Sequence, residues 1–301
     1  MIRQEFRNQV NLLLAVIPEV GKEECFALHG GTAINLFLRN MPRLSVDIDL
    51  TYVHIEDREV SVRKINEALL RIKSNIESVV PAVLVTHLPL AFKLLISTKN
   101  AIVKLEVNQV KRGIYGATFK GVLCETAQNE FDTFCTIPLV PISQVYGGKI
   151  CAALARQHPR DLFDIKFLLN TEGFSEEIKT GFLLELLGGN KPIHEIISPN
   201  LINQRSAMEK QFQGMSAEQF TYNDFEETRS LLIASLHEKL TEYDKQFLLS
   251  IQRLEPDWSI YFFQDFPAVK WKLMNIKTLM ENNEKKYKEH YDTLTHLLFQ
   301  K

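Results

Sequence analysis

Residues 28–53 read LHGGTAINLFLRNMPRLSVDIDLTYV, and this stretch decides the predicted fold. Gly30 and Gly31 allow a tight turn with exposed backbone N–H groups, and Thr32 can cap the helix that follows. Three apolar side chains then recur at the spacing of one helix face, at Ile34, Phe37 and Leu38. Because proline cannot continue a helix, Pro42 ends it. The pattern predicts a glycine turn and a short helix.

The second half of the stretch predicts a strand that carries two acids. Apolar and polar side chains alternate from Leu44 to Thr51, which is the period of a β-strand. Asp47 and Asp49 therefore project from one face, roughly 6–7 Å apart at the backbone, and two such carboxylates can share a divalent cation. The helix N-terminus behind the glycines offers donors for phosphate. An Asp-x-Asp pair is also common in turns and on exposed strands, so the pair alone leaves a purely structural interpretation open.

Residues 101–110, AIVKLEVNQV, predict a second informative strand. Its alternation places Val103, Leu105 and Val107 on one face and the polar side chains on the other. If this strand pairs beside the Asp-x-Asp strand, Glu106 joins Asp47 and Asp49 as a third acid on the metal side. The alternative is a solvated face on which Lys104 and Glu106 are ordinary surface charges.

Residues 141–169 predict a helical hairpin that Pro159 interrupts. Lys149 lies in the first helix beside two glycines, and its ammonium group suits a triphosphate. Asp164 lies one turn after Arg160, and Asp161 precedes Asp164 in what we interpret as the other helical phase. The alternative is a structural hairpin linked by an Arg160–Asp164 ion pair.

The remaining pattern completes an α+β chain. Helical spacing predicts helices over 2–20 and 56–76, and strand patterns predict a hairpin of 82–88 with 92–97 and a strand over 134–140. From residue 171 the chain becomes helix-rich, over 174–188, 193–213, 224–253 and 268–299. We therefore expect a first domain over 1–170 and a helical C-terminal domain over 171–301.

Composition excludes several classes of protein. The chain is 45% hydrophobic and 24% charged with a net charge of −2, which argues against a strongly basic coat for nucleic acid but not against a local basic groove. Its four cysteines form no C-x-x-C pair, and no run reaches transmembrane length, so we expect a cytoplasmic protein without membrane contact. The P-loop and G-x-S-x-G motifs are absent, which argues against a P-loop NTPase or a serine hydrolase.

Taken in order, the motifs resemble those of one family. They are GGTA at 30–33, RLSVDIDL at 43–50, KLEVN at 104–108, GGKICAAL at 147–154, HPRDLFDIK at 158–166, EPDWS at 255–259 and PAVKWKL at 267–273. In this order they resemble the AbiEii/AbiGii-type nucleotidyltransferase toxins of bacterial toxin–antitoxin and abortive-infection systems, within the DNA polymerase β-like superfamily. The resemblance spans nearly the whole chain.

The resemblance implies a fold and a site. The fold would be a nucleotidyltransferase-like mixed β-sheet flanked by helices and followed by a helical C-terminal region. The implied site residues fall into three groups: Gly30, Gly31 and Thr32 for the nucleotide phosphates; Asp47, Asp49 and Glu106 for Mg²⁺; and Lys149 and Asp164 as the later lysine and aspartate that such toxins need, with Lys149 on the triphosphate.

The resemblance also implies a reaction. NTP would be the co-substrate, and the 3′ end of tRNA or another RNA would be the acceptor, so that translation stops; a cognate antitoxin is a possible partner. Two alternatives stay open at this point. The same site could modify a protein acceptor, or the chain could be a non-catalytic nucleotide-binding module that acts by contact.

Overall fold

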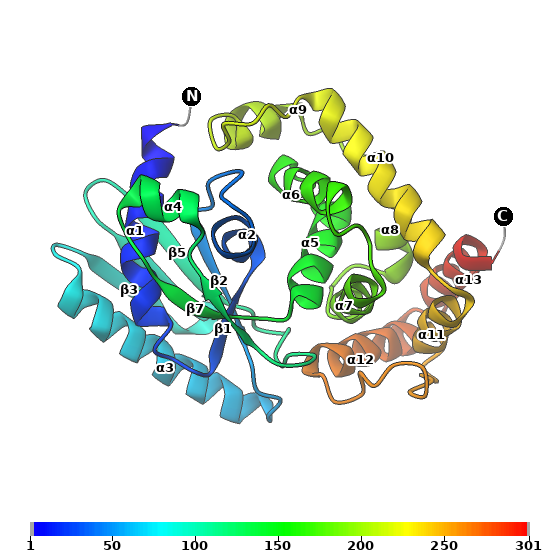
Figure 1. The fold of residues 1–301 in the computed structure, drawn as a ribbon. Coiled ribbons are helices and arrows are strands. Elements are labelled where there is room, and N and C mark those ends of the chain that lie inside the picture. Colours follow the sequence, from blue (N-terminus) through cyan, green and yellow to red (C-terminus); the bar gives the residue numbers. More distant parts are fainter. Residues whose placement is uncertain (1–2, 300–301) are drawn as a thin grey trace. The chain divides into compact units, whose positions relative to one another are not determined.

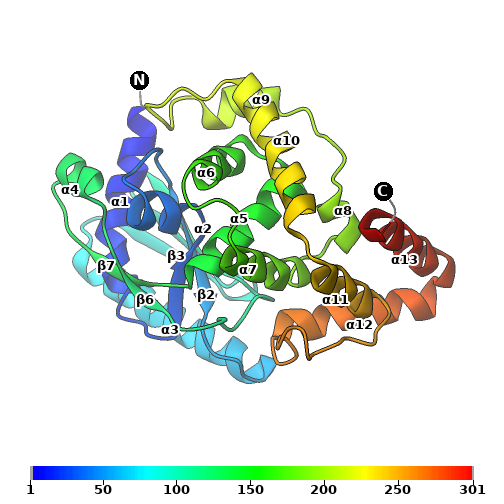
Figure 2. The ribbon, with the colours of Figure 1, turned by 45° about the vertical axis from the view of Figure 1, so that its right-hand side comes forward.

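A computed structural model describes residues 3–299 and has the predicted α+β class, with a mixed sheet and many helices (Figures 1 and 2). Its contacts divide the chain into two compact units. The first runs to Val145 and includes Glu209–Gln219, and the second comprises Tyr146–Met208 and continues from Phe220. The sequence suggested a boundary at 170/171. The division in the structure comes earlier because the helical hairpin packs with later helices; Gly147, for example, lies against the backbone of Gly181.

The first unit is built on a seven-stranded sheet with the order β3-β4-β5-β2-β1-β7-β6. The strands are β1 (Phe26–His29), β2 (Asp47–Tyr52), β3 (Leu84–Leu88), β4 (Lys93–Ser97), β5 (Ile102–Val107), β6 (Phe119–Val122) and β7 (Thr136–Leu139). The predicted hairpin is confirmed as the antiparallel pair β3–β4, joined by the 3₁₀ turn η2 (Pro89–Ala91). Central strand β2 lies antiparallel to β1 and parallel to β5.

Two long helices and several short helical segments accompany this sheet. They are α1 (Gln4–Val20), α2 (Gly30–Thr32), the π-helical turn η1 (Ala33–Leu38), α3 (Arg58–Val79) and α4 (Glu125–Phe131). Helices α1 and α3 contact each other and pack on the sheet (Figure 1). The alternate side chains Ile48, Leu50, Val103, Leu105 and Val107 are fully buried. Because successive strand residues point to opposite faces, the acids of β2 and β5 lie on the other side of the sheet.

The second unit is helical. Its helices are α5 (Ile142–Arg156), α6 (Pro159–Asn170), α7 (Glu176–Leu187), α8 (Ile193–Ile197), α9 (Arg205–Ala207), α10 (Tyr222–Lys239), α11 (Glu242–Gln252), α12 (Pro267–Asn282) and α13 (Glu284–Phe299). The first turn of α5 belongs to the first unit, and the π-helical turn η3 (Met208–Phe212) lies where the chain passes from one unit to the other. The continuous pattern over 224–253 is two helices: the first ends at Lys239 with Leu240 as its C-cap, and the Thr241 hydroxyl caps the second. The pattern over 268–299 is likewise interrupted at Asn283.

Candidate nucleotide and metal site

Strand β2 presents its two acids on one face, as the alternation predicted. Asp47 and Asp49 are half-buried, while Ile48 and Leu50 between and after them have no exposed surface. The neighbouring strand β5 runs parallel to β2, with Glu106 directly opposite Asp49. The condition under which Glu106 joins the other two acids, a pairing of these two strands, is therefore met, and the three acids share one sheet face.

Gly30 makes room for the carboxylate of Asp49. Its φ is +73°, and a Cβ atom added to it would lie 2.5 Å from Asp49 Oδ2. The residue before it, His29, pairs with Asp49 across β1 and β2, and its Nδ1 atom lies 3.0 Å from the Thr51 hydroxyl. Only glycine tolerates both this backbone conformation and this contact. The sequence predicted a glycine turn before the helix, but Gly30 and Gly31 are the first residues of α2 itself. The backbone at the start of this helix therefore lies close to the Asp49 carboxylate.

Thr32 connects the glycine segment to the acid strand. Its hydroxyl donates a hydrogen bond to the carbonyl oxygen of Asp47 and lies 3.0 Å from the hydroxyl of Ser45. The side chain has no exposed surface. These contacts hold the end of α2 beside the first acid. The assignment of this hydroxyl to the nucleotide phosphates stays a prediction.

Two residues beside this turn were not recognised as site residues from the sequence. A Cβ atom added to Gly31 would lie 2.9 Å from both Arg43 Nη2 and Ser45 Oγ. Arg43 is 3% exposed and donates a hydrogen bond from Nη1 to the Leu44 carbonyl oxygen at 2.9 Å. The alternation of the strand could have indicated both residues, because in an extended chain positions 43 and 45 point to the same face as positions 47 and 49.

The third acid has a lysine neighbour that the sequence did not reveal. Glu106 lies between two strands, opposite Asp49 on β2 and opposite Lys93 on β4. In this structure Glu106 Oε2 is 2.7 Å from Lys93 Nζ, and the Glu106 side chain is 51% exposed. The carboxylate is thus on the predicted face, and it is paired there with an ammonium group.

The donor set fits a divalent ion held by two carboxylates. Within residues 3–299, no group of three or more His, Cys, Asp or Glu side chains is arranged to hold a metal ion. Glu106, engaged with Lys93, does not complete such a group with Asp47 and Asp49. Mg²⁺ is commonly held by one or two carboxylates, with waters and substrate phosphates as its other ligands. Gly30 lets the backbone at the start of α2 approach the Asp49 carboxylate closely, which is consistent with that arrangement.

The second unit holds the predicted lysine and aspartate in a buried ionic cluster on α5 and α6. Lys149 Nζ lies 2.9 Å from Asp161 Oδ1 and 3.0 Å from Asp164 Oδ2. Arg156 binds Asp161 through Nε at 2.6 Å and Nη2 at 3.0 Å. Both aspartates contact the same ammonium group, so the assignment of Asp161 to another helical phase is wrong: residues three apart on a helix are neighbours.

Burial determines the electrostatics of this cluster. Asp161 and Asp164 are each 1% exposed and Lys149 is 6% exposed. Burial pushes the pKa of Asp161 upward, but the charge of Lys149 and the charge and hydrogen bonds of Arg156 together outweigh it and hold that pKa below its ordinary value. Asp161 is therefore a permanent anion at neutral pH, matched by two cations.

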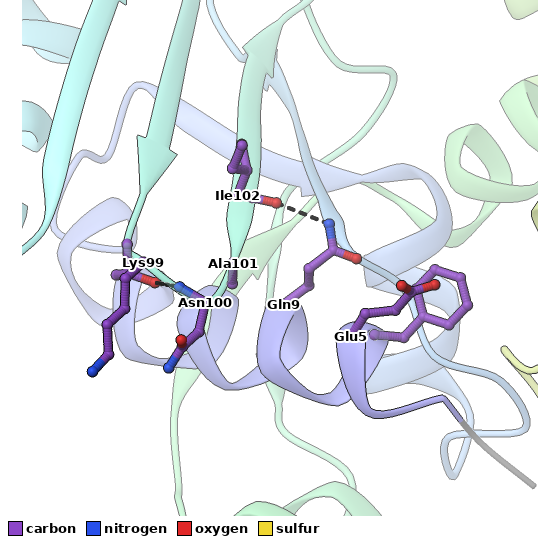
Figure 3. Close-up of a pocket in the computed structure, with 8 residues that line it drawn as sticks. Glu5, Gln9, Lys99, Asn100, Ala101 and Ile102 are labelled. Atoms are coloured by element: carbon purple, nitrogen blue, oxygen red, sulfur yellow. Dashed lines mark hydrogen bonds between the residues drawn. The ribbon is translucent and has the colours of Figure 1, made fainter.

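A cleft of about 520 Å³ lies elsewhere in the first unit (Figure 3). It is lined by the start of α1, including Glu5, Phe6 and Gln9, and by the β4–β5 turn from Thr98 to Ile102. Gln9 Nε2 donates a hydrogen bond to the Ile102 carbonyl oxygen at 2.9 Å across it. None of the predicted site residues lines this cleft. Among the described helices, none combines the length and the hydrophobicity needed to cross a membrane.

Comparisons with known proteins agree with this fold and with the motifs. Residues 11–275 match a family model described as "Nucleotidyl transferase AbiEii toxin, Type IV TA system". Among solved structures, the chain is similar to MenT4, a nucleotidyltransferase toxin from Mycobacterium tuberculosis H37Rv. That match has a TM-score of 0.64 at 13% sequence identity and covers 91% of this chain and 95% of that one, a likeness in fold. No curated protein matches the sequence.

Proposed function

The chain belongs to the AbiEii family of nucleotidyltransferase toxins, and from this premise we propose that it transfers a nucleoside monophosphate from an NTP to the 3′ end of tRNA, with Mg²⁺ held by Asp47 and Asp49. The family belongs to type IV toxin–antitoxin systems, so a cognate antitoxin accompanies the toxin. The proposal concerns the metal, the residues and the acceptor. It places the activity in the cytoplasm, where tRNA and NTPs are present together.

One observation carries the proposal: Asp47 and Asp49 share a sheet face beside a glycine whose backbone closely approaches the Asp49 carboxylate. The close approach of Gly30 to Asp49 Oδ2 brings backbone N–H groups next to a carboxylate. A carboxylate that binds metal and N–H groups that bind phosphate are the two parts that a metal–triphosphate complex requires. The Thr32 hydroxyl contacts both the Ser45 hydroxyl and the Asp47 carbonyl oxygen, and it thereby holds the glycine segment beside the acid strand.

The reaction itself needs little covalent chemistry from the protein. The acceptor hydroxyl oxygen attacks the α-phosphorus, a new P–O bond forms, and the bond between the α-phosphorus and the bridging oxygen breaks as pyrophosphate leaves. Bound Mg²⁺ supplies electrostatic stabilisation of the charge on the triphosphate. Gly30 and Gly31 would hold phosphate oxygens through their N–H groups. Asp47 and Asp49 would orient the triphosphate so that pyrophosphate leaves in line with the attack.

Glu106, Lys149 and Asp164 complete the proposed set. Glu106, on the same face as Asp49, would serve as the third acid and accept the proton of the attacking hydroxyl. Lys149 is proposed to contribute positive charge toward the triphosphate, with Asp164 orienting it through their 3.0 Å contact. Because two carboxylates already hold its ammonium group, Lys149 also has a structural role.

A labelled-nucleotide assay tests the proposal. Purified protein is incubated with each α-³²P-NTP and Mg²⁺, first with purified tRNA and then with lysate proteins freed of nucleic acid. We expect label on the tRNA 3′ end and loss of that label with Asp49→Ala. The matched control is Asp57→Ala, which removes an exposed aspartate whose side chain makes no cap hydrogen bond at the start of α3. Label on protein alone would replace tRNA by a protein acceptor.

Growth of cells that express the protein gives a second test. Asp49→Ala is expected to remove growth inhibition while its urea unfolding midpoint stays close to that of wild type, because Asp49 lies on the half-exposed face of the sheet. If the Asp49→Ala protein transfers label and inhibits growth as the parent does, the proposed role of the acids is wrong.

A further inference from the structure

Lys93 is the feature of the candidate site that its motifs leave without a role. It is the first residue of β4, the strand that lies between β5 and the edge strand β3. Across the strands the register places three residues in a row: Asp49 on β2, Glu106 on β5 and Lys93 on β4. All three project from the face that carries the acids. Glu106 thus has a carboxylate neighbour on one side and an ammonium neighbour on the other.

This row gives Glu106 two positions. Neighbouring strands lie about 4.8 Å apart, so a glutamate side chain can lean toward either neighbour. In the structure it leans toward Lys93, with Oε2 2.7 Å from Nζ. Opposite charges across a strand pair attract and like charges repel, which favours the position beside Lys93 over the position beside Asp49. A divalent cation at Asp49 reverses the balance, because it attracts Glu106 more strongly than one ammonium group does.

We propose that Lys93 is a positioning residue that holds Glu106 away from Asp47 and Asp49 and releases it when a divalent cation binds there. The proposal rests on the proposed function of the acids and adds a residue to it. It accounts for the fact that the described residues contain two acids beside the glycine segment but no three-acid metal group. The third acid is available on the correct face and is occupied by Lys93 in this structure.

The pair is suited to release because it is exposed. The Lys93 and Glu106 side chains are 24% and 51% exposed, and ion pairs of this kind contribute little to stability. A cation therefore displaces Lys93 at a small cost. Removing the lysine removes that cost and one repelling charge, which strengthens cation binding by about fivefold, equivalent to about 1 kcal/mol.

Binding of Mn²⁺ alone, followed by the electron paramagnetic resonance signal of the free ion, measures this effect without any assay of transfer. The variants are Lys93→Met, Glu106→Gln and the double variant. Lys93→Arg keeps the cation, and Lys99→Met removes an exposed lysine from the β4–β5 turn as the matched control. We expect about fivefold tighter binding for Lys93→Met, affinities within twofold of wild type for Lys93→Arg and Lys99→Met, and no tightening by Lys93→Met in the Glu106→Gln background.

Each outcome has one meaning. Equal or weaker binding by Lys93→Met overturns the role of Lys93 and leaves the proposed function standing. If Lys93→Met also tightens Mn²⁺ binding in the Glu106→Gln background, the role of Lys93 is overturned as well, because the lysine then acts through its charge alone. Absence of Mn²⁺ binding in every variant overturns both the inference and the metal site on which it rests. Circular dichroism spectra verify that each variant is folded.

Discussion

Two groups of charged residues in this molecule were predicted as functional, and the structure gives them opposite surroundings. The acids of the first unit lie on a half-exposed sheet face, where the absence of a side chain at Gly30 accommodates the Asp49 carboxylate. In the second unit, Lys149 is enclosed with Asp161 and Asp164, each at most 6% exposed. The first group is partly exposed to solvent, whereas the second is enclosed within the protein.

Residue type and spacing in the sequence therefore identify charged clusters, but they do not identify the oppositely charged groups that neutralise each cluster in the fold. A buried ammonium group with two carboxylates is held firmly, and losing one partner leaves an uncompensated charge in a low dielectric. A partly exposed acid can be removed with a smaller effect on stability. Stability and activity should therefore respond in opposite ways to substitutions in the two groups, and the following predictions use that contrast.

The largest expected effect is on stability, in the buried cluster. Lys149→Met removes the cation shared by Asp161 and Asp164, and we expect the free energy of unfolding to fall by about 3–5 kcal/mol. Urea denaturation measures the change. The double variant Lys149→Met/Asp164→Asn removes one charge of each sign, and because Arg156 still binds Asp161, part of the loss should be recovered.

The same variant separates the two proposed roles of Lys149. If Lys149→Met keeps the wild-type unfolding free energy but loses transfer of label, the lysine acts on the triphosphate and the contrast between the clusters fails. If the folded Lys149→Met protein transfers label at the wild-type rate, its proposed phosphate role is wrong.

A smaller effect on stability but a large one on activity is expected for Gly30→Ala. The new Cβ atom would lie 2.5 Å from Asp49 Oδ2 at a positive φ, so the carboxylate must move. We expect a stability loss of roughly 1–2 kcal/mol from the backbone and a fall in transfer of about 100-fold from the displaced acid. Gly173→Ala is the matched control, because Gly173 has a φ of +68° and no neighbouring atom within 4 Å of an added Cβ.

Gly173→Ala should thus show the backbone cost without loss of transfer. Equal transfer by Gly30→Ala and Gly173→Ala would mean that the close approach of Gly30 to the Asp49 carboxylate is irrelevant to the reaction. Urea denaturation and the labelled-nucleotide assay supply the two readings.

The smallest expected effect is pH-dependent and lies in the second unit. Asp224 closes the capping box with Thr221 at the start of α10 and lies 2.7 Å from Lys166. The Lys166 hydrogen bond, with those from Thr221, lowers the pKa of Asp224 to about 2. Because the folded pKa lies below the unfolded value of about 3.9, the stabilisation is complete above pH 4 and disappears as pH falls through 2.

Asp224→Asn should therefore destabilise the protein by about 1 kcal/mol at pH 7, since the residue is partly exposed. The difference from wild type should shrink at pH 3, measured by urea denaturation at both values. A difference that is constant from pH 7 to pH 3 would show that the carboxylate charge is not what Asp224 contributes.

Much of the first unit could be predicted because its signals are local. The period of two over residues 44–51 and 101–110 gave both strands and the face of each acid, and the sheet then placed Glu106 opposite Asp49. The short strand β6 and helix α4 were missed because neither is long enough to show a clear period. The capping box at Thr241 and Asp244 could have revealed the break in 224–253.

The partners of the charged residues could not be predicted, because they come from other elements. Lys93 meets Glu106 only once β4 and β5 are paired in register. Lys149 meets Asp161 and Asp164 only once α5 and α6 pack together, although the i, i+3 spacing of the two aspartates already placed them on one helix face. Buried Arg43 beside Gly31 belongs to the same category. Tertiary contacts thus decide which charges are available for a ligand.

The central claim, that Asp47 and Asp49 together hold a divalent cation, can be tested without knowing the acceptor. Isothermal titration of Mn²⁺ into wild type and Asp47→Asn/Asp49→Asn measures it directly, with circular dichroism to show that both proteins are folded. The account predicts that the double variant loses the binding seen in wild type, by at least about 100-fold in affinity, since it removes both proposed carboxylate ligands. Binding by the folded double variant at the wild-type affinity would contradict it.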